Sequence, residues 1–326
     1  MILITGGAGF IGSNLVAGLE ESGAGPLAVC DQPGADARNI AKRQLAANIA
    51  PDALFPFLED HRGEMRTVFH MGATSSTMET DAALFARNNY RLSLDLWQWC
   101  ARHGVRLIYA SSAATYGDGA LGFDDDGSIA ALARLKPLNL YGRSKHLFDR
   151  RVAHLLAEGA PRPPQWAGLK FFNVFGPNEY HKGNQKSVVA TAYPAAAAGE
   201  PVRLFKSHHP DYADGGQLRD FVWVGDCVSV MLWLFENEAV DGLFNIGTGQ
   251  ARSFDDLARA LFAALDRPPK IDYIDMPIAI REHYQYFTEA RMDRLRAAGY
   301  VQPFTSLEAG VETYVRDYLN QANPYR

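Results

Sequence analysis

The chain has 326 residues, of which 47% are hydrophobic and 21% are charged, and its length predicts one large domain or two. This composition excludes a disordered chain, because so high an apolar content with so little charge favours a packed core. The 32 basic residues face 37 acidic ones, the formal net charge is −5 and no Lys/Arg tract occurs, which disfavours nucleic acids and anionic membranes as partners.

The first residues of the chain are predicted to belong to the folded protein and not to a signal peptide. Its first 19 residues carry no charge but include five glycines, and the first basic residue is Arg38, so the basic region of a signal peptide is missing. No other stretch holds the roughly 20 apolar residues that a membrane helix needs. We therefore expect a cytoplasmic protein.

Strands and helices alternate along the first half of the chain. Short apolar runs predict strands at 1–5, 27–31, 67–70, 107–110 and 169–174. Between them, helical spacing of apolar residues predicts helices that include 81–103 and 141–157. This alternation is typical of an α/β protein with a doubly wound parallel sheet, covered by helices on both faces.

The first strand and helix enclose a glycine motif. Residues 2–12 read I-L-I-T-G-G-A-G-F-I-G, with Gly6, Gly9 and Gly12 in a G-x-x-G-x-x-G pattern. Such glycines allow a tight turn and a close approach to a pyrophosphate, which the N-terminus of the helix attracts. Asp31 ends the next strand, where a carboxylate accepts hydrogen bonds from an adenosine ribose. The sequence therefore predicts a dinucleotide cofactor.

The residues after the second strand leave the choice of dinucleotide open. Asp31 alone favours NAD, because a carboxylate repels a 2′-phosphate. Arg38, Lys42 and Arg43 follow, and such a basic cluster would neutralise the 2′-phosphate of NADP. The same cluster also fits the solvated face of a helix.

A candidate catalytic group follows in the middle of the chain. Tyr141 and Lys145 are four residues apart, so on a helix they share one face. Ser111 and Ser112 follow a predicted strand, at the edge where a doubly wound sheet binds ligands. The lysine cation and a nicotinamide ring would lower the pKa of the tyrosine, which could then exchange a proton while hydride moves. The serine would orient the reacting oxygen.

The second half of the chain is less regular and rich in proline. The alanines at 195–198 indicate the end of a small helix before Gly199. Polar and turn residues at 207–217 predict a surface loop. Ser253 and Asp256 form a predicted capping box that opens a helix at 254–265.

The cysteines indicate neither disulfides nor a metal site. Cys30, Cys100 and Cys227 lie far apart, and none belongs to a C-x-x-C pair. We therefore expect three reduced thiols in or near the core, and no bound metal.

Together these residues resemble the extended short-chain dehydrogenase/reductase family, whose members act largely on nucleotide sugars. Four further segments agree: R-N-N-Y with Asn88, F-F-N-V-F-G-P with Asn173, R-D-F-V-W-V-G-D at 219–226 and F-N-I-G-T-G at 244–249. The resemblance implies a Rossmann cofactor domain at 1–172 plus about 220–248. A smaller mixed substrate domain would span about 173–219 plus 249–326.

Other segments are similar to a branch of this family, the epimerases of ADP-activated heptoses in lipopolysaccharide inner-core synthesis. They are A-S-S-A-A-T-Y-G at 110–117, H-K-G at 181–183, Y-Q-Y-F-T at 284–288 and M-G-A-T-S-S-T around Ala73. The resemblance implies NADP, with NAD as the alternative, and transient oxidation of C6″ followed by return of hydride to the other face. Tyr141 would serve one epimer and Lys182 the other, with a phosphate-binding or surface lysine as the alternative for Lys182. It also implies a homo-oligomer, a pentamer in this branch.

The resemblance assigns residues to two sites. Those implied to line the cofactor are Gly6, Gly9, Phe10, Ile11, Gly12, Asp31, Gln32, Arg38, Met71, Gly72, Ala73, Thr74, Ser75, Asn88, Lys145, Val174 and Lys182. Those implied to line the substrate are Ser112, Asn173, Asn184, Thr191, Phe205, Lys206, Ser207, Arg219 and Tyr284. Arg219 fits a diphosphate because its planar fork matches two oxygens, although a salt bridge to Asp220 or Asp226 is the alternative.

The chain departs from the family in three respects. The family often has Ser where Asn184 stands and His where Thr191 stands, and both replacements remain polar. The loop at 207–217 is longer than in other members, so substrate choice could differ. The family's basic residues near the adenosine phosphate do not align with Arg38, Lys42 and Arg43, which leaves the choice between NADP and NAD open.

Two competing functions remain open at this point. Another nucleotide-sugar 4-epimerase or 4,6-dehydratase would share the fold, but dehydratases place an acid pair beside the serine, where this chain has Ala113 and Ala114. A catalytically inactive, dinucleotide-binding sensor is disfavoured by the intact Ser112, Tyr141 and Lys145.

Overall fold

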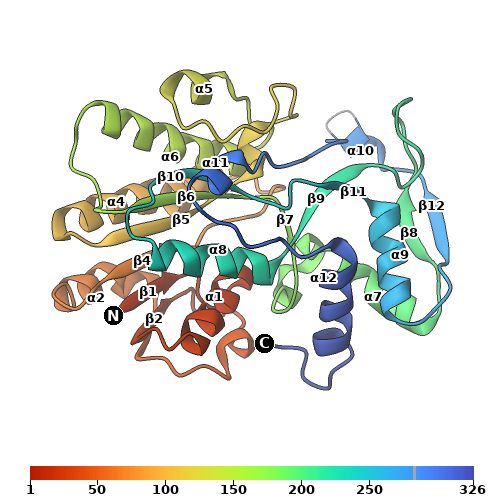
Figure 1. The fold of residues 1–326 in the computed structure, drawn as a ribbon, viewed down its shortest axis with the longest axis horizontal. Helices are drawn as coiled ribbons and strands as arrows, with labels where there is room; N and C mark the ends of the chain where they lie inside the picture. Colours follow the sequence, from red (N-terminus) through yellow and green to blue (C-terminus); the bar gives the residue numbers. More distant parts are fainter. Residues whose placement is uncertain (282–283) are drawn as a thin grey trace.

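The computed structural model describes residues 1–281 and 284–326. Its central sheet has seven parallel strands in the order β10-β6-β5-β4-β1-β2-β3 (Figure 1). The strands are β1 (Ile2–Thr5), β2 (Leu27–Cys30), β3 (Ala47–Ile49), β4 (Thr67–His70), β5 (Arg106–Ser112), β6 (Trp166–Phe171) and β10 (Gly242–Ile246). The order reverses between β1 and β4, and ligands of open parallel sheets bind at such a point.

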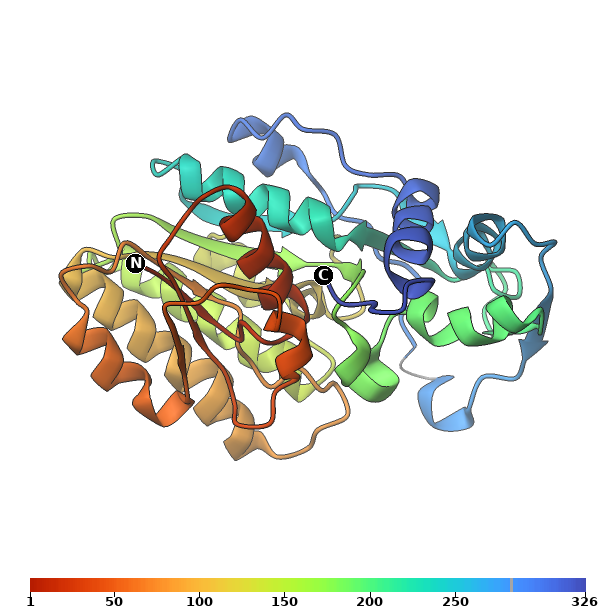
Figure 2. The ribbon, with the colours of Figure 1, turned by 90° about the horizontal axis from the view of Figure 1, so that it is seen from below.

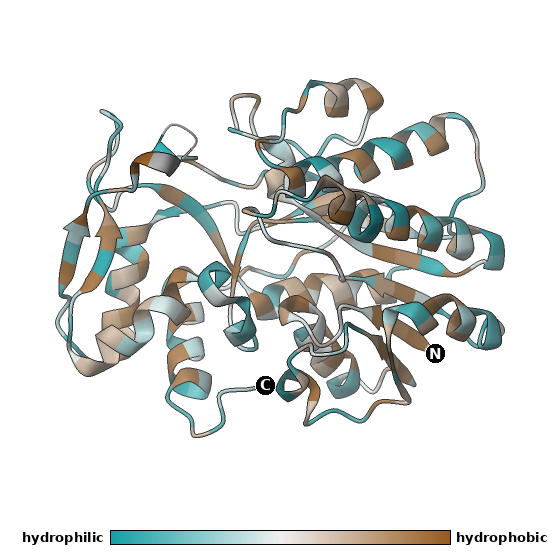
Figure 3. Ribbon diagram, turned by 180° about the vertical axis from the view of Figure 1, so that it is seen from behind, coloured by the Kyte–Doolittle hydropathy of each residue, from teal (hydrophilic) through white to brown (hydrophobic). Residues whose placement is uncertain are grey.

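Helices cover both faces of this sheet (Figure 2). Ile2 and Ile4 of β1 pack into the cluster that includes α1 (Phe10–Glu21) and α8 (Val224–Glu236). Leu3, pointing to the opposite face, packs with α2 (Leu54–Asp60), α4 (Leu92–His103) and α6 (Leu140–Ala157). Because side chains alternate along a strand, apolar residues at successive positions are buried on both faces. The strands beside the N-terminus are accordingly mostly hydrophobic in Figure 3. The predicted fold class is confirmed.

Two elements of the structure differ in detail from those predicted from the sequence. The helix predicted at 81–103 consists of α3 (Ala82–Phe85), a π-helical segment (Ala86–Arg91) and α4. The strand predicted at 169–174 divides at Phe172, where β6 ends and β7 (Asn173–Phe175) leaves the central sheet. The short strand β3 was not predicted, because its three residues carry little apolar periodicity.

The rest of the chain builds two smaller sheets. One has the order β11-β9-β7 and the other pairs β12 with β8. Helices α7, α9 and α12 pack around them in a separate apolar cluster. The elements are β8 (Val202–Phe205), β9 (Leu218–Trp223), β11 (Ala251–Ser253), β12 (Ile271–Ile274), α7 (Val188–Ala198), α9 (Phe254–Ala264) and α12 (Leu307–Tyr314).

Short helical segments complete the chain. The α-helical ones are α5 (Ile129–Arg134), α10 (Ile278–Arg281) and α11 (Asp293–Ala297). The 3₁₀ segments are Ala37–Ile40, Pro51–Ala53, Ala113–Tyr116 and Tyr180–Gln185, and a π-helical segment spans Val315–Leu319. No helix within 1–281 or 284–326 is long and apolar enough to cross a membrane.

Several local predictions are confirmed. Ser253 and Asp256 form the capping box of α9, with Asp256 N donating to Ser253 Oγ at 2.9 Å. Helix α7 ends at Ala198, and Gly199 caps it in the left-handed region. Residues 207–217 form the loop between β8 and β9. The three cysteines are buried free thiols.

Candidate active site

The glycine motif forms a tight cradle between β1 and α1. Gly6 has φ +66°, and a Cβ there would lie 2.6 Å from the backbone of Gly72, at the end of β4. A Cβ on Gly12 would lie 2.1 Å from the Gly6 carbonyl oxygen. The N-cap of α1, Gly9, supplies no side-chain cap. The first N–H groups of such a helix attract an anion, so the cradle fits a pyrophosphate.

A cavity of about 320 Å³ opens beside the cradle, at the ends of β2 and β3. Asp31 lines it and accepts hydrogen bonds from the backbone N–H groups of Ala8 at 2.9 Å and Gln32 at 2.8 Å. The remaining wall is largely small or apolar: Ala8, Gln32, Pro33, Gly34, Ala35, Ala37, Ile40, Asn48, Ile49 and Ala50. A mostly apolar pocket with a fixed carboxylate fits the adenosine part of a dinucleotide.

The three basic residues near this cavity have different partners. Arg38 forms a two-point ion pair with Asp36, at 2.7 and 2.9 Å, while its side chain stays 70% exposed. Arg43 is turned to Glu20 on α1 at 2.8 Å, and Lys42 donates to the carbonyl of Tyr325. Arg38, beside the cavity residue Ala37, is therefore the cation best placed to meet a phosphate there.

The segment after β4 lies across the cradle and is fastened to the π-helical segment. Asn89 accepts from Thr74 N at 2.8 Å, and Asn88 Nδ2 donates to Thr74 Oγ1 at 3.1 Å. Gln185 Nε2 donates to the Ser75 carbonyl at 3.4 Å. Asn89 was not predicted, although it adjoins the predicted Asn88, because its role depends on a contact across the fold.

Tyr141 and Lys145 lie on one face of α6, as predicted. Asn139 caps this helix by accepting from Gly142 N at 2.8 Å. Lys145 is 4% exposed, and its Nζ donates to the Ala110 carbonyl on β5 at 2.7 Å. Burial lowers the pKa of Lys145 to about 8. Burial raises the pKa of Tyr141, and a hydrogen bond with Ser112 opposes that shift. The protein side chains by themselves therefore do not give the lowered tyrosine pKa that we expected, and the positive nicotinamide ring has to add to the charge of Lys145.

The structure distinguishes the two serines at the end of β5. Ser111 points into the interior, where its Oγ donates to Asp149 Oδ2 at 2.7 Å. Ser112 points the other way, toward Tyr141, and its Oγ also accepts from Ala114 N at 3.1 Å. Because successive side chains alternate along a strand, only one of the two can face the site. Ser112 is the one that does.

Lys182 lies above the start of α1. Its Nζ is 5.2 Å from the centroid of the Phe10 ring, which follows the glycine cradle. Burial lowers the pKa of Lys182, and the nearby Glu179 opposes that change. The neighbouring His181 contacts the side-chain amide of Asn39 at 3.3 Å. The H-K-G segment is thus packed against the cofactor cradle.

Arg219 is 8% exposed, and aromatic rings flank its guanidinium. The carbon Cζ lies 5.3 Å from the Tyr284 ring centroid and 5.6 Å from that of Phe254. Its nitrogens donate to the carbonyls of Leu218, at 2.8 Å, and Gln285. Burial lowers the pKa of Arg219, but an arginine side chain in a protein remains charged.

The alternative partners of Arg219 are engaged elsewhere. Asp220 accepts from the backbone N–H groups of Thr248, Gly249 and Ala290, and Asp226 accepts from Thr305. The alternative reading of Arg219, as a salt bridge to one of these aspartates, is therefore wrong.

Among the other predicted substrate residues, Tyr284 contacts this arginine directly. Phe205 packs edge-on against Tyr284 at 6.4 Å, and Asn173 accepts from Thr288 Oγ1 at 3.4 Å. Lys206 pairs with Asp275 at 3.4 Å. The exposed Asn184 and Thr191 lie on the 3₁₀ segment 180–185 and on α7, and Ser207 begins the loop after β8.

An aromatic cluster next to Tyr284 was not predicted. Tyr286 packs against Tyr284 at 5.4 Å and against two side chains of the 207–217 loop, Tyr212 at 5.1 Å and His209 at 5.2 Å. The Y-Q-Y pattern contained a signal, since alternate residues of an extended segment share a face. The loop partners could not be found from the sequence, because they are far away along the chain.

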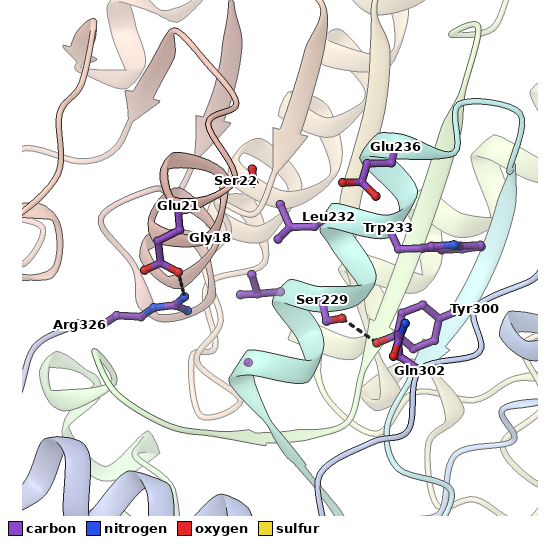
Figure 4. A pocket seen from close by; sticks show the side chains of 12 residues that line it. Gly18, Glu21, Ser22, Ser229, Leu232, Trp233, Glu236, Tyr300, Gln302 and Arg326 are labelled. Atoms are coloured by element: carbon purple, nitrogen blue, oxygen red, sulfur yellow. Dashed lines mark hydrogen bonds and ion pairs between the residues drawn. The ribbon is translucent and has the colours of Figure 1, made fainter.

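A larger cavity, of about 560 Å³, lies between α1 and α8 (Figure 4). Its wall includes Gly18 and Leu232, and Arg326 and Glu21, which form an ion pair, also line it. Within the part of the chain that the structure describes, none of the predicted cofactor or substrate residues lines it. The predicted site residues therefore lie elsewhere, and the candidate active site comprises the cradle, Tyr141 and Arg219 with their neighbours.

Comparisons with known proteins agree with this geometry. A sequence model of the NAD dependent epimerase/dehydratase family matches residues 2–247. The chain is 50% identical to the ADP-L-glycero-D-manno-heptose-6-epimerase of Nitratidesulfovibrio vulgaris strain DP4, and 43% identical to that of Fusobacterium nucleatum, over 100% of each chain. The structure is similar to that of the Helicobacter pylori ADP-L-glycero-D-manno-heptose-6-epimerase, with TM-score 0.80 and 28% identity, covering 97% of this chain and 95% of that one.

A more distant structure shares the fold. It is the UDP-glucose 4-epimerase of Thermus thermophilus in complex with NAD, with TM-score 0.73 and 24% identity, covering 95% and 96% of the two chains. Because the family model spans most of the sequence, this chain belongs to the NAD-dependent epimerase/dehydratase family. The family resemblance predicted from the sequence is confirmed.

Proposed function

We propose that the protein interconverts ADP-D-glycero-D-manno-heptose and ADP-L-glycero-D-manno-heptose by transient oxidation at C6″ with bound NADP. The full-length relatives named for this activity, at 39–50% identity, support the substrate. The observation that carries the proposal is that Tyr141 and Lys145 share one face of α6 near Ser112, with the Lys182 amine against Phe10 at the cradle. This arrangement supplies two proton-handling groups at one cofactor site.

The chemistry divides between the cofactor and the side chains. When bound, the nicotinamide supplies a hydride acceptor for C6″ and a donor to the opposite face of the same carbon. Tyr141 takes the proton of the C6″ hydroxyl in one substrate orientation and returns it in the reverse step. Ser112 orients the reacting oxygen. The charge of Lys145 favours the phenolate of Tyr141 and binds the nicotinamide ribose.

A second group is needed because the sugar presents its other face after rotation about C5″–C6″. Lys182 is suited to that role, since burial lowers its pKa and brings proton exchange closer to neutral pH. Each cycle returns the proton and the hydride to the same carbon and oxygen, so the net redox change is zero.

Arg219 is the proposed anchor for the substrate diphosphate. A guanidinium donates two parallel hydrogen bonds to phosphate oxygens, and its buried setting strengthens them. Ser112, Asn173, Asn184, Thr191, Phe205, Lys206, Ser207 and Tyr284 complete the proposed substrate site.

The cofactor assignment to NADP is the finer part of the proposal. Family membership supports a nicotinamide dinucleotide, and the cradle, the cavity at Asp31 and the exposed Arg38 fit its phosphates and adenosine. Arg38 would exchange Asp36 for the 2′-phosphate. Gly6, Gly9, Phe10, Ile11, Gly12, Gln32, Met71, Gly72, Ala73, Thr74, Ser75, Asn88, Lys145, Val174 and Lys182 complete the proposed cofactor site.

The domain division and the assembly also belong to the proposal. We divide the chain into a cofactor domain, 1–172 plus about 220–248, and a substrate domain comprising the rest. The return of α8 and β10 to the central sheet supports that division. Homo-oligomerisation, as a pentamer, and a cytoplasmic location rest on the family resemblance.

Two measurements test the function. The purified protein is incubated with ADP-D-glycero-D-manno-heptose without added cofactor, and the C6″ epimers are followed by NMR. Interconversion supports the proposal, whereas none by protein shown to retain NADP contradicts it. Faster turnover of UDP-glucose would favour a 4-epimerase instead. The nucleotide released on denaturation is expected to be NADP, and NAD would correct that assignment.

A further inference from the structure

A buried ion pair lies directly beneath the residues assigned to catalysis. Asp149 on α6 and Lys170 on β6 are 2.7 Å apart, and their side chains are 0% and 1% exposed. Burying two charges is costly unless their remaining hydrogen-bonding positions are filled. Here they are filled: Asp149 also accepts from Ser111 Oγ at 2.7 Å and Tyr109 Oη at 3.2 Å.

The lysine extends the same network to the backbone of the site. Lys170 Nζ donates to Thr115 Oγ1 at 2.8 Å, and Thr115 Oγ1 donates to the Ser112 carbonyl at 2.8 Å. The Ser111 side chain is thus fixed by the Asp149 carboxylate, while the Ser112 carbonyl is fixed by Thr115. The network fixes the backbone on both sides of the Ser111–Ser112 peptide bond, and Ser112 is the serine that faces Tyr141.

The carboxylate also acts on Lys145 through space. Asp149 lies one helical turn after Lys145 on α6, so the two side chains share a face. Burial lowers the pKa of Lys145, and the charge of Asp149 opposes that shift. Lys145 can favour the phenolate form of Tyr141 only while the lysine itself is protonated.

The other titratable groups around Lys145 are neutral or paired at neutral pH, so Asp149 is the main charge that acts on this lysine. His70 on β4 is neutral, because burial and the charge of Lys145 lower its pKa to about 3. In the protein without cofactor, Tyr141 on α6 and Tyr109 on β5 stay protonated, since burial raises the pKa of both. Lys170 on β6 lies beyond Asp149, against whose carboxylate it is paired.

We propose that Asp149, held in place by Lys170, is a positioning residue of the active site: it aligns Ser112 through Ser111 and sets a negative charge one helical turn from Lys145. This inference rests on the roles proposed above for Ser112, Tyr141 and Lys145. Asp149 itself reaches neither substrate nor cofactor, because its two oxygens are taken up by Lys170, Ser111 and Tyr109.

The test separates the charge of Asp149 from its contribution to folding. Asp149→Asn keeps the shape but leaves Lys170 unpaired, so a second variant, Asp149→Asn with Lys170→Met, removes both buried charges. Asp149→Glu retains the carboxylate. Asp226→Asn is the matched control, since Asp226 is a buried carboxylate that binds Thr305 away from the site. Thermal unfolding establishes that each variant is folded.

The first measurement does not depend on turnover. Protein labelled with [13C]lysine contains eight lysines, and the Lys145 signal is identified by its loss in Lys145→Arg. We expect Lys145 to titrate roughly one pH unit lower or more in both variants that lack the Asp149 charge, because a nearby opposite charge favours the protonated form by that amount. Asp149→Glu and Asp226→Asn should leave the titration near that of the wild type.

The second measurement is the pH profile of epimerisation. The basic limb of kcat should move to lower pH in Asp149→Asn and in the double variant, with KM changed less than about twofold. An unchanged Lys145 titration in the folded double variant, or an equal shift in Asp226→Asn, would overturn the inference. If the wild type does not epimerise the ADP-heptose, the proposed function fails while the lysine titration still decides the role of Asp149.

Discussion

Replacing Arg219 by lysine should weaken nucleotide binding selectively. The guanidinium is held between the Phe254 and Tyr284 rings and donates to two carbonyls, so its fork is fixed before a diphosphate arrives. A lysine keeps the charge but offers a point donor in place of the fork. Losing one of two charge-assisted hydrogen bonds costs about 1.5–3 kcal/mol. At about 1.4 kcal/mol per tenfold, that corresponds to roughly a ten- to hundredfold weaker affinity.

The assay is calorimetric binding of ADP, with kcat and KM for the ADP-heptose measured in parallel. Arg219→Lys should raise Kd and KM together and change kcat little, because the diphosphate is bound equally in the ground and transition states. Arg259→Lys is the matched control, since Arg259 forms an exposed ion pair with Asp255 on α9. An ADP affinity within about twofold of the wild type would refute the assignment of Arg219 to the diphosphate.

Three further outcomes follow from the site and its core. Tyr141→Phe should lower kcat by about 10²–10⁴-fold without releasing the bound nucleotide, and an unchanged rate would contradict its role as acid and base. Gly12→Ala should lower nucleotide retention and Tm, because its Cβ would lie 2.1 Å from the Gly6 carbonyl oxygen; the control Gly63→Ala meets nothing within 4 Å and should behave as the wild type. Burial lowers the pKa of His70 to about 3, so between about pH 6.5 and 3 the unfolded chain binds the extra proton and stability falls as pH drops. The free energy of unfolding, measured with denaturant at about pH 7 and about pH 5, should change less in His70→Gln than in the wild type. An equal change in both proteins would exclude His70 as a cause of the pH dependence.

Much of the cofactor site could be predicted because its signals are local. The cradle depends on glycines within one turn, and Tyr141 and Lys145 depend on the four-residue spacing of one helix. The capping box of α9 and the left-handed cap at Gly199 depend on neighbouring residues as well. Each signal lies within a few residues, so the sequence is sufficient to find it.

The sequence by itself therefore determined the alternating architecture, the glycine cradle and the residue types of the candidate active site. The resemblance already assigned Ser112 to the site, and the tertiary structure adds the reason, because Ser111 binds Asp149 in the interior while Ser112 faces Tyr141. Only the tertiary structure decided that Arg219 lies near two aromatic rings, with no carboxylate partner among residues 1–281 and 284–326. It alone revealed the Asp149–Lys170 pair beneath the site. The physical reason is that these features depend on side-chain direction and on contacts between segments far apart in the chain. No periodicity or turn pattern records such contacts.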